Sequence, residues 1–165
     1  MIEIGFKKIE LEDKDLITHY FKHHTSRSCE RTFVNVYLWA RFYHVKFAEV
    51  EHTLVFRTED EDGFSFAYPA GEPENVKKAL DVLMVYSKER GVPFLMYTVT
   101  PDNFEYLEKW YPGRFEIEYV EGDADYVYES EKLATLSGKK LHSKRNHVNK
   151  FKIVYADRWS YEPIS

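Results

Sequence analysis

Cysteine and long apolar runs are scarce in this sequence, and each scarcity excludes a class of protein. Cys29 is the only cysteine among 165 residues, so an intrachain disulfide is impossible. No apolar run approaches the ~20 residues that a membrane helix needs. The N-terminal stretch MIEIGFKKIELEDKD also lacks the apolar core of a secretory signal. We therefore expect a cytoplasmic protein with no transmembrane segment and no disulfide scaffold.

Aromatic residues are abundant instead. The chain has 13 Tyr and 12 Phe, and its aromatic fraction is 17%. Its hydrophobic fraction of 44% is ordinary for a globular protein and argues against disorder. The length suffices for one domain with a sizeable core, in which we expect ring packing to dominate.

Charge is distributed unevenly along the chain. The formal net charge is −5, yet residues 139–158 hold seven Lys or Arg and one Asp. Residues 1–138 hold 16 basic and 26 acidic residues. A reversal that is confined to one segment is typical of a contact with a polyanion. The acidic remainder argues against general binding of nucleic acid.

The hydrophobic pattern predicts helices and then a strand meander in the first part of the chain. A short strand is expected over 6–11, and Asp13 is a suitable cap for a helix that runs to residue 24. A second helix follows over 31–43. The three strand candidates cover 45–50, 53–57 and 63–68.

Helices and strands alternate in the second part of the chain. A helix is predicted from about Glu74 to Arg90, and Gly91 ends it. The further elements are a buried strand over 94–99, a helix over 101–111, strands over 115–120 and 124–130, the basic helix, and a strand over 158–164. This order predicts an α+β fold, in which a mixed, largely antiparallel sheet is flanked by helices.

The order of elements resembles the acyl-CoA N-acyltransferase (GNAT-like) fold. Three segments resemble one family more specifically: SCERTFVNVYLWARFY (28–43), DADYVYESEKLATLSGKK (123–140) and LHSKRNHVNKF (141–151). This is the bacterial family related to the C-terminal part of phosphatidylglycerol lysyltransferases. Its characterised relatives move an aminoacyl group from a transfer RNA to a lipid headgroup. The resemblance therefore implies an acyl- or aminoacyl-transferase-like protein.

Members of that family typically carry two such folds in tandem and are twice as long as this chain. The resemblance implies that the chain is one half of a tandem protein, with a second GNAT-like domain as its partner. We expect residues 1–158 to form a single GNAT-like domain and residues 159–165 to be the first strand of the second domain. An open docking face could also drive homodimerisation.

The basic segment LSGKKLHSKRNHVNKF (136–151) supplies the candidate binding residues. At 100° per residue, four polar side chains share one flank of a helix. They are His142, Arg145, Asn146 and Asn149. These are directional hydrogen-bonding groups, and a guanidinium can hold phosphate through two parallel bonds. The lysines that would add long-range attraction are Lys139, Lys140, Lys144 and Lys150.

The expected ligand of this segment bears phosphate, as donor or acceptor of the transfer, in the class of aminoacyl-tRNA or a lipid headgroup. Acetyl-CoA is disfavoured as the donor. The loop YPAGEPEN (68–75) puts Glu72 and Glu74 where acetyltransferases of this fold hold pyrophosphate at a helix N-terminus. No G-x-G pattern occurs in the chain. The sequence assigns no cofactor and no general base.

Other interpretations of the basic segment stay open. It could be a solvated surface helix that pairs with the acidic body, or a docking surface for a partner domain. The alternative function is a non-catalytic binding or assembly module that holds a partner domain, RNA or a phosphorylated small molecule. RNA binding would weaken steeply as salt rises, whereas an apolar domain interface would not.

Metal and nucleophile chemistry have weaker support. His19 and His23 are four residues apart and His24 is adjacent, but no third ligand is evident, so no metal site is predicted. Cys29 lies beside a predicted helix start without an identifiable catalytic partner. We expect this cysteine to have a packing or turn role.

Overall fold

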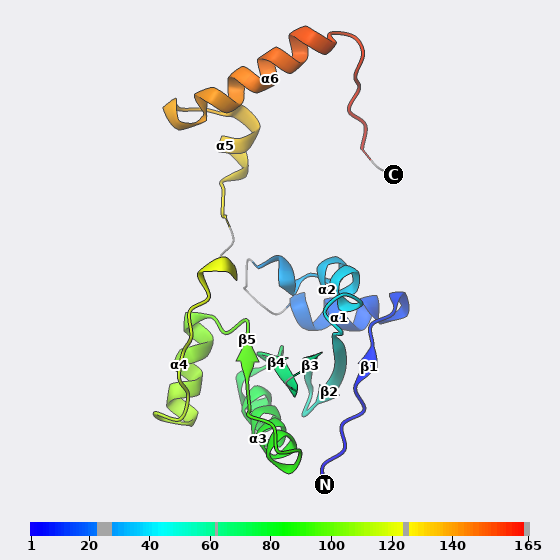
Figure 1. Cartoon of the computed structure of the whole chain (residues 1–165), viewed down its shortest axis with the longest axis vertical. Helices are drawn as coiled ribbons and strands as arrows, with labels where there is room; N and C mark the ends of the chain where they lie inside the picture. Colours follow the sequence, from blue (N-terminus) through cyan, green and yellow to red (C-terminus); the bar gives the residue numbers. More distant parts are fainter. Residues whose placement is uncertain (23–27, 62, 124–125, 164–165) are drawn as a thin grey trace. The chain divides into compact units, whose positions relative to one another are not determined.

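The chain forms two compact units, Met1–Tyr119 (unit 1) and Val120–Ser165 (unit 2). The computed structural model describes residues 1–22, 28–61, 63–123 and 126–163. Over these described ranges, unit 1 holds a sheet with four α-helices, and unit 2 holds two further α-helices (Figure 1). In the described part of the chain, no helix has the length and apolar character that crossing a membrane requires.

A five-stranded sheet in the order β1-β2-β3-β4-β5 is the centre of unit 1 (Figure 1). Its strands are β1 (Lys7–Lys8), β2 (Lys46–Val50), β3 (Thr53–Asp60), β4 (Gly63–Ala67) and β5 (Met96–Tyr97). Neighbouring strands are antiparallel except β4 and β5, which are parallel, with Phe66 opposite Met96. The α+β class with a mixed, largely antiparallel sheet is thereby confirmed.

The turn between β2 and β3 sets which side chains face each side of the sheet. Glu51 and His52 have φ of 49° and 58°, and Val50 pairs with Thr53 across them. Positive φ at both central residues is the type I′ geometry, whose twist matches that of the strands. Successive β3 residues then point to opposite faces.

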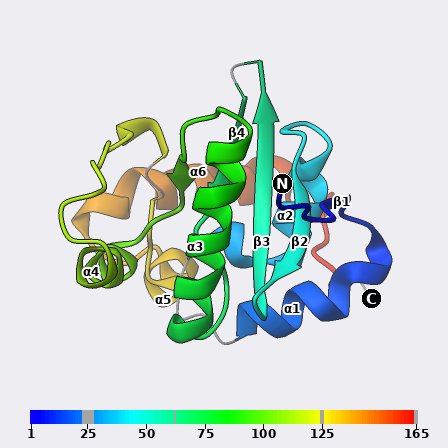
Figure 2. The same cartoon turned by 90° about the horizontal axis from the view of Figure 1, so that it is seen from below.

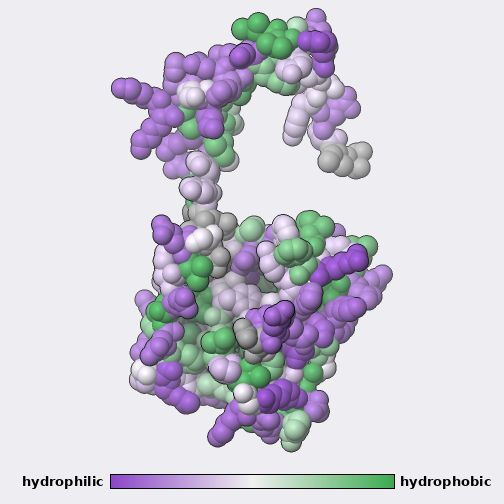
Figure 3. All heavy atoms as spheres, in the orientation of Figure 1, coloured by the Kyte–Doolittle hydropathy of each residue, from purple (hydrophilic) through white to green (hydrophobic). Residues whose placement is uncertain are grey.

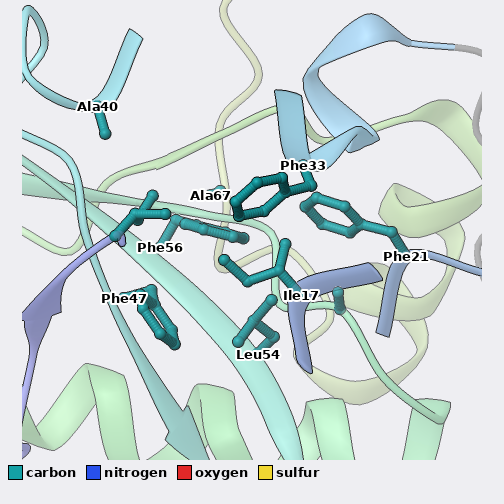
Figure 4. Close-up of a cluster of buried hydrophobic side chains, with 10 residues drawn as sticks. Ile17, Phe21, Phe33, Ala40, Phe47, Leu54, Phe56 and Ala67 are labelled. Carbon is teal, nitrogen blue, oxygen red and sulfur yellow. The ribbon is translucent and has the colours of Figure 1, made fainter. Parts of the chain in front are cut away.

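Helices cover both faces of the sheet (Figure 2). The helices of unit 1 are η1 (Leu11–Asp13), α1 (Lys14–Lys22), η2 (Cys29–Arg31), α2 (Phe33–Ala40), α3 (Pro73–Glu89) and α4 (Pro101–Trp110). On one face, Ile17 and Phe21 of α1 and Phe33 of α2 pack with Leu54 and Phe56 of β3 (Figure 4). The rings of Phe21 and Phe56 stack with centroids 5.7 Å apart.

The opposite face of the sheet is covered by α3. Leu83 and Tyr86 of α3 pack with Val55 of β3 and Phe66 of β4. A third cluster joins α3 to α4 through Leu107. Aromatic rings recur in all three clusters, which confirms the ring-rich core that the composition predicted.

Asp13 closes the turn before α1 instead of capping a longer helix. Its Oδ2 accepts a hydrogen bond from the Glu10 backbone N–H at 3.0 Å, and Lys7 Nζ donates to its Oδ1 at 2.6 Å. The carboxylate is buried, with 7% of the residue exposed. Burial raises the pKa of Asp13, but the hydrogen bonds from Lys7 and Glu10 outweigh it and lower the pKa below its ordinary value.

The strands predicted beyond α4 are not formed by the described residues of those segments. The described residues of 115–120, 126–129 and 158–163 belong to no strand of the sheet. An alternating pattern describes a segment with two faces, but a strand also needs a neighbouring edge for its hydrogen bonds. In this structure the described residues of these segments pair with no strand. The assignment of 159–165 to a second domain stays a prediction.

Unit 2 consists of short helices around no core of its own. Its elements are η3 (Glu121–Asp123), α5 (Ser130–Thr135), η4 (Lys139–Leu141) and α6 (His142–Tyr155). None of its residues whose burial the structure describes is buried, and Tyr126 is 89% exposed. Segments of this length rarely fold without a core, a metal or a partner. The exposed apolar side chains of unit 2 could be buried only against a further surface.

We predict that Asp13→Asn lowers the free energy of unfolding at pH 7 by about 1.5–3 kcal/mol, since it removes a charged acceptor from two hydrogen bonds. A carboxyl with a lowered folded pKa stabilises the fold above its unfolded pKa of about 3.9. That stability is lost as pH falls through the folded pKa. The gap between wild type and variant should therefore close in acid.

Urea unfolding at pH 7 and at several values below pH 4 measures this gap. Asp15→Asn is the matched control: Asp15 is exposed in the first turn of α1, so its removal should cost only about 0.3–1 kcal/mol. A gap that stays constant down to the acid limit would contradict the assigned role of Asp13.

Candidate functional site

The basic segment folds as a 3₁₀ turn, η4, that leads directly into α6. The sequence predicted one continuous helix here, and the structure places Lys139, Lys140 and Leu141 in the turn instead. Gly138 precedes the turn with φ of 91°, and Leu136 ends α5 with φ of 49°. The chain thus bends sharply between α5 and α6.

Arg145 stabilises this bend. Its Nη1 donates to the carbonyl oxygens of Leu136 and Gly138, the latter at 3.1 Å. The side chain is half-buried, unlike most of its neighbours on α6. Arg145 therefore has a structural role in unit 2, which sequence spacing could not reveal. Its other guanidinium nitrogens have no partner among the described residues.

His142, Asn146 and Asn149 lie together on the same flank of α6, as the helical spacing predicted. Asn146 Nδ2 lies 3.5 Å from His142 Nδ1, one helical turn away. All three residues are exposed. Their polar groups are open to a ligand, and no described residue outside α6 hydrogen-bonds to them.

The lysines of this segment are exposed cations without carboxylate partners in the described part of the chain. Lys139, Lys140, Lys144 and Lys150 are all exposed. The ion pair within unit 2 joins Lys132 to Glu129 and involves none of them. Within the described residues of unit 2, these four lysines are therefore unpaired. The face is electrostatically available to an anion.

An apolar stripe runs along a different side of α6. Its members are Val148, Phe151 and Tyr155, joined by Trp159 beyond the helix. Phe151 packs against the rings of Tyr155 and Trp159 at centroid distances of 4.8 and 5.6 Å. Each of the four is more than 40% exposed. The helix thus presents a polar flank and an apolar stripe, and neither is covered within unit 2.

A second polar cluster, in unit 1, was not anticipated from the sequence. Tyr68 follows β4 and Tyr97 ends β5, and the Tyr68 N–H donates to the Tyr97 carbonyl oxygen at 3.0 Å. Arg31 Nη2 donates to the Tyr68 carbonyl oxygen at 2.8 Å. The Tyr97 hydroxyl lies 2.8 Å from Thr58 Oγ1. This cluster sits at the carboxyl ends of the two parallel strands, where ligands commonly bind in such sheets.

Burial sets the protonation of this cluster. It lowers the pKa of the Arg31 guanidinium, raises the pKa of Tyr97, and raises the pKa of Tyr68 to about 12. Both phenols therefore stay neutral at pH 7, where they can donate hydrogen bonds. Arg31 lies 5.9 Å from the Phe21 ring, and the negative charge of neighbouring Glu30 partly offsets the effect of burial on its pKa. Such a guanidinium can hold a carboxylate or a phosphate.

Thr98 directly follows Tyr97, the last residue of β5, and its backbone is strained. Its φ is 55°, in the left-handed region that a β-branched residue rarely adopts. Its Oγ1 is buried without a hydrogen-bond partner. Strain and an unmet hydroxyl together are a feature of ligand sites.

The start of α3 does not form a phosphate cradle of the glycine-rich kind. Glu72 is its N-cap residue and Glu74 lies in the first turn, so two carboxylates occupy the positive end of the helix. A Cβ on Gly71 would lie 2.8 Å from Thr53 Cγ2. This glycine is therefore needed for close packing against β3.

The remaining candidates from the sequence are three histidines and Cys29. No group of metal-ligating side chains occurs among the residues that the structure describes. His23 and His24 lie outside the described residues, and the ring of His19 lies 5.8 Å from the ring of Tyr20. Cys29 is a free, exposed thiol at the start of η2, in the turn region that was expected.

Comparison with known proteins relates this chain to one family. A family model described as phosphatidylglycerol lysyltransferase, C-terminal, matches residues 21–164. The chain is also similar to a crystal structure of a conserved protein of unknown function from Bacteroides thetaiotaomicron. That match has a TM-score of 0.89 and 34% identity, and covers 99% of this chain and 54% of the other.

A shorter similarity links the chain to an uncharacterised protein of Mycoplasmoides gallisepticum. The two are 41% identical over 44 residues, which is 26% of this chain and 14% of that protein. This chain thus spans about half of the Bacteroides protein and a small part of the Mycoplasmoides protein.

We predict that Arg145→Ala speeds amide hydrogen exchange between Leu136 and Leu141, since it frees two carbonyl oxygens that the guanidinium now holds. Hydrogen exchange with mass spectrometry measures the effect at peptide resolution. Lys144→Ala removes a neighbouring charge without such a contact and should leave exchange unchanged. Equal rates in wild type and Arg145→Ala would contradict the structural role.

Thr98→Gly should raise the free energy of unfolding by about 1 kcal/mol, since glycine relieves the backbone strain and removes the unmet hydroxyl. Val99→Gly, at a neighbour without positive φ, should instead lower it. Thermal and urea unfolding measure both. A loss of stability in Thr98→Gly would show that the threonine side chain contributes more than its strain costs.

Proposed function

Because the chain belongs to the phosphatidylglycerol lysyltransferase C-terminal domain family, we propose that it is one half of an acyl- or aminoacyl-transferase-like protein. In this proposal, residues 139–152 bind a phosphate-bearing donor or acceptor of the aminoacyl-tRNA or lipid-headgroup class. The observation that carries it is the exposed polar flank of α6, with unpaired lysines around His142, Asn146 and Asn149.

The proposed fold is GNAT-like. In support, a strand meander is followed by α3, a parallel β5 and α4, the order expected for that fold. Chemistry on such a scaffold depends mostly on positioning the two substrates, plus a base for the attacking group. We assign no base to this chain. The second half of the tandem protein is proposed to complete the site.

The residues of α6 divide into two roles in this proposal. Asn149, His142 and Asn146 supply directional hydrogen bonds to the ligand. The free nitrogens of Arg145 can add one more contact while Nη1 holds the bend. The surrounding lysines attract the polyanion before contact, so salt should slow and weaken binding.

A second candidate function is an assembly module without catalysis. The apolar stripe of Val148, Phe151 and Tyr155 favours it, because an uncovered apolar surface on a helix is suited to a partner protein. In that case α6 docks a domain, and its charges orient the approach.

Thermal melting separates these proposals. The panel comprises glycerol phosphate, coenzyme A, nucleotides and an aminoacyl-tRNA mimic. A ligand at a hundred times its Kd adds ~2.7 kcal/mol to the free energy of unfolding. We expect stabilisation by the tRNA mimic or by glycerol phosphate, and none specific to coenzyme A, whose pyrophosphate the carboxylates at the start of α3 would repel.

The diagnostic variant combines three substitutions, Lys140→Gln, Lys144→Gln and Lys150→Gln. It retains Arg145 and therefore the bend before α6. It should weaken binding at least tenfold, or about 1.4 kcal/mol. Its matched control is Lys8→Gln, Lys78→Gln, Lys109→Gln, the same charge change on exposed lysines of unit 1. Absence of any ligand effect, or equal weakening by both variants, would contradict binding at α6.

A further inference from the structure

An exposed aromatic surface covers the outer side of α2 and the turn that follows it. Its members are Val34, Leu38, Trp39, Phe42 and Tyr43, here called the α2 patch, with 63, 65, 49, 71 and 52% of each residue exposed. Val34 and Leu38 are four residues apart and lie on one side of α2, and Phe42 lies in the turn that follows. Phe33 and Ala40 are buried against the sheet. Figure 3 shows hydrophobic atoms gathered over this part of unit 1.

The rings of the α2 patch pack on one another. Trp39 lies 6.1 Å from Phe42 and 5.8 Å from Tyr43, and Phe42 lies 4.9 Å from Tyr43 between centroids. Mutual packing restricts their rotamers before any partner arrives, which lowers the entropy lost on binding. Trp, Tyr and Phe around a neighbouring arginine, here Arg41, are the residue types enriched at protein interfaces.

We propose that the α2 patch is the docking surface for a second folded domain, the one that the longer members of the family carry. The inference rests on the proposal that this chain is one half of a tandem protein. The Bacteroides protein matches this chain over 99% of its length, yet a little under half of that protein lies outside the match. That remainder is long enough to be a domain of similar size.

The chemistry of the α2 patch suits a protein partner better than a lipid surface. A helix that lies on a membrane carries Lys and Arg along its polar side. α2 (Phe33–Ala40) contains no charged residue, and the turn after it adds only Arg41 and His44. The segment with a net positive charge is 139–158, which is not part of α2. A large apolar patch on an uncharged helix is typical of a surface that another domain covers.

The test mixes the 165-residue chain with the separately produced part of the Bacteroides protein that lies outside the match. Light scattering and titration calorimetry then measure the complex. We expect the wild-type chain to form a one-to-one complex. The double variant Leu38→Glu, Phe42→Glu, here called the α2 variant, should bind at least a hundredfold more weakly. The control is Val85→Glu, Leu95→Glu, two other exposed apolar residues of unit 1, which should change Kd less than threefold.

Four results would overturn the proposal. The wild-type chain does not bind the Bacteroides part, or the α2 variant binds it as tightly as the wild type. A fall of many degrees in the Tm of the α2 variant alone would mean that the chain already covers the patch itself. A wild-type homodimer that the variant dissolves would assign the patch to a second copy.

The ligand panel on the same α2 variant keeps this test distinct from the proposed function. Binding at α6 should persist in that variant, because none of the α2 patch lies on α6. Loss of the domain complex with retained ligand binding supports docking at α2. Retained docking with no ligand effect in any variant contradicts only the role of the basic helix.

Discussion

Unit 1 buries an apolar core on both faces of its sheet and unit 2 buries none of its described residues, and the rest of the structure depends on that difference. The sheet of unit 1 has helices on both faces, and Leu54 and Val55 are completely buried on opposite sides of β3. Unit 2 buries none of its described residues. Burial contributes about 25 cal/mol per Å² of apolar surface, so unit 2 gains little by folding alone.

Because unit 2 has no buried core among its described residues, two kinds of surface stay exposed on α6. The polar flank of α6 has His142, Asn146 and Asn149, and a separate stripe has Val148 and Phe151. A ligand and a protein partner could therefore both contact α6 without competing for the same side chains. Arg145 belongs to neither surface alone, since it also holds the bend before the helix. Its removal would disturb both.

The parallel pair β4 and β5 gives unit 1 a second place of chemical interest. The crossover through α3 brings Tyr68 beside Tyr97, and η2 brings Arg31 to the same point. Thr98 follows there with a strained backbone. A neutral phenol, a guanidinium and an unmet hydroxyl at strand ends can position an acyl or anionic group. The carboxylates at the start of α3 would oppose a pyrophosphate nearby.

The sequence by itself determined the helices and central strands of unit 1, the ring-rich core and the place of the basic segment. Those properties follow from local periodicity, composition and charge, which need no knowledge of distant contacts. Only the tertiary structure decided that 115–120 and 126–129 stay unpaired, that Arg145 binds Leu136 and Gly138, and that Arg31 meets Tyr68. A strand or a site exists only where a second segment supplies the partner atoms, and that depends on how the chain crosses itself in space.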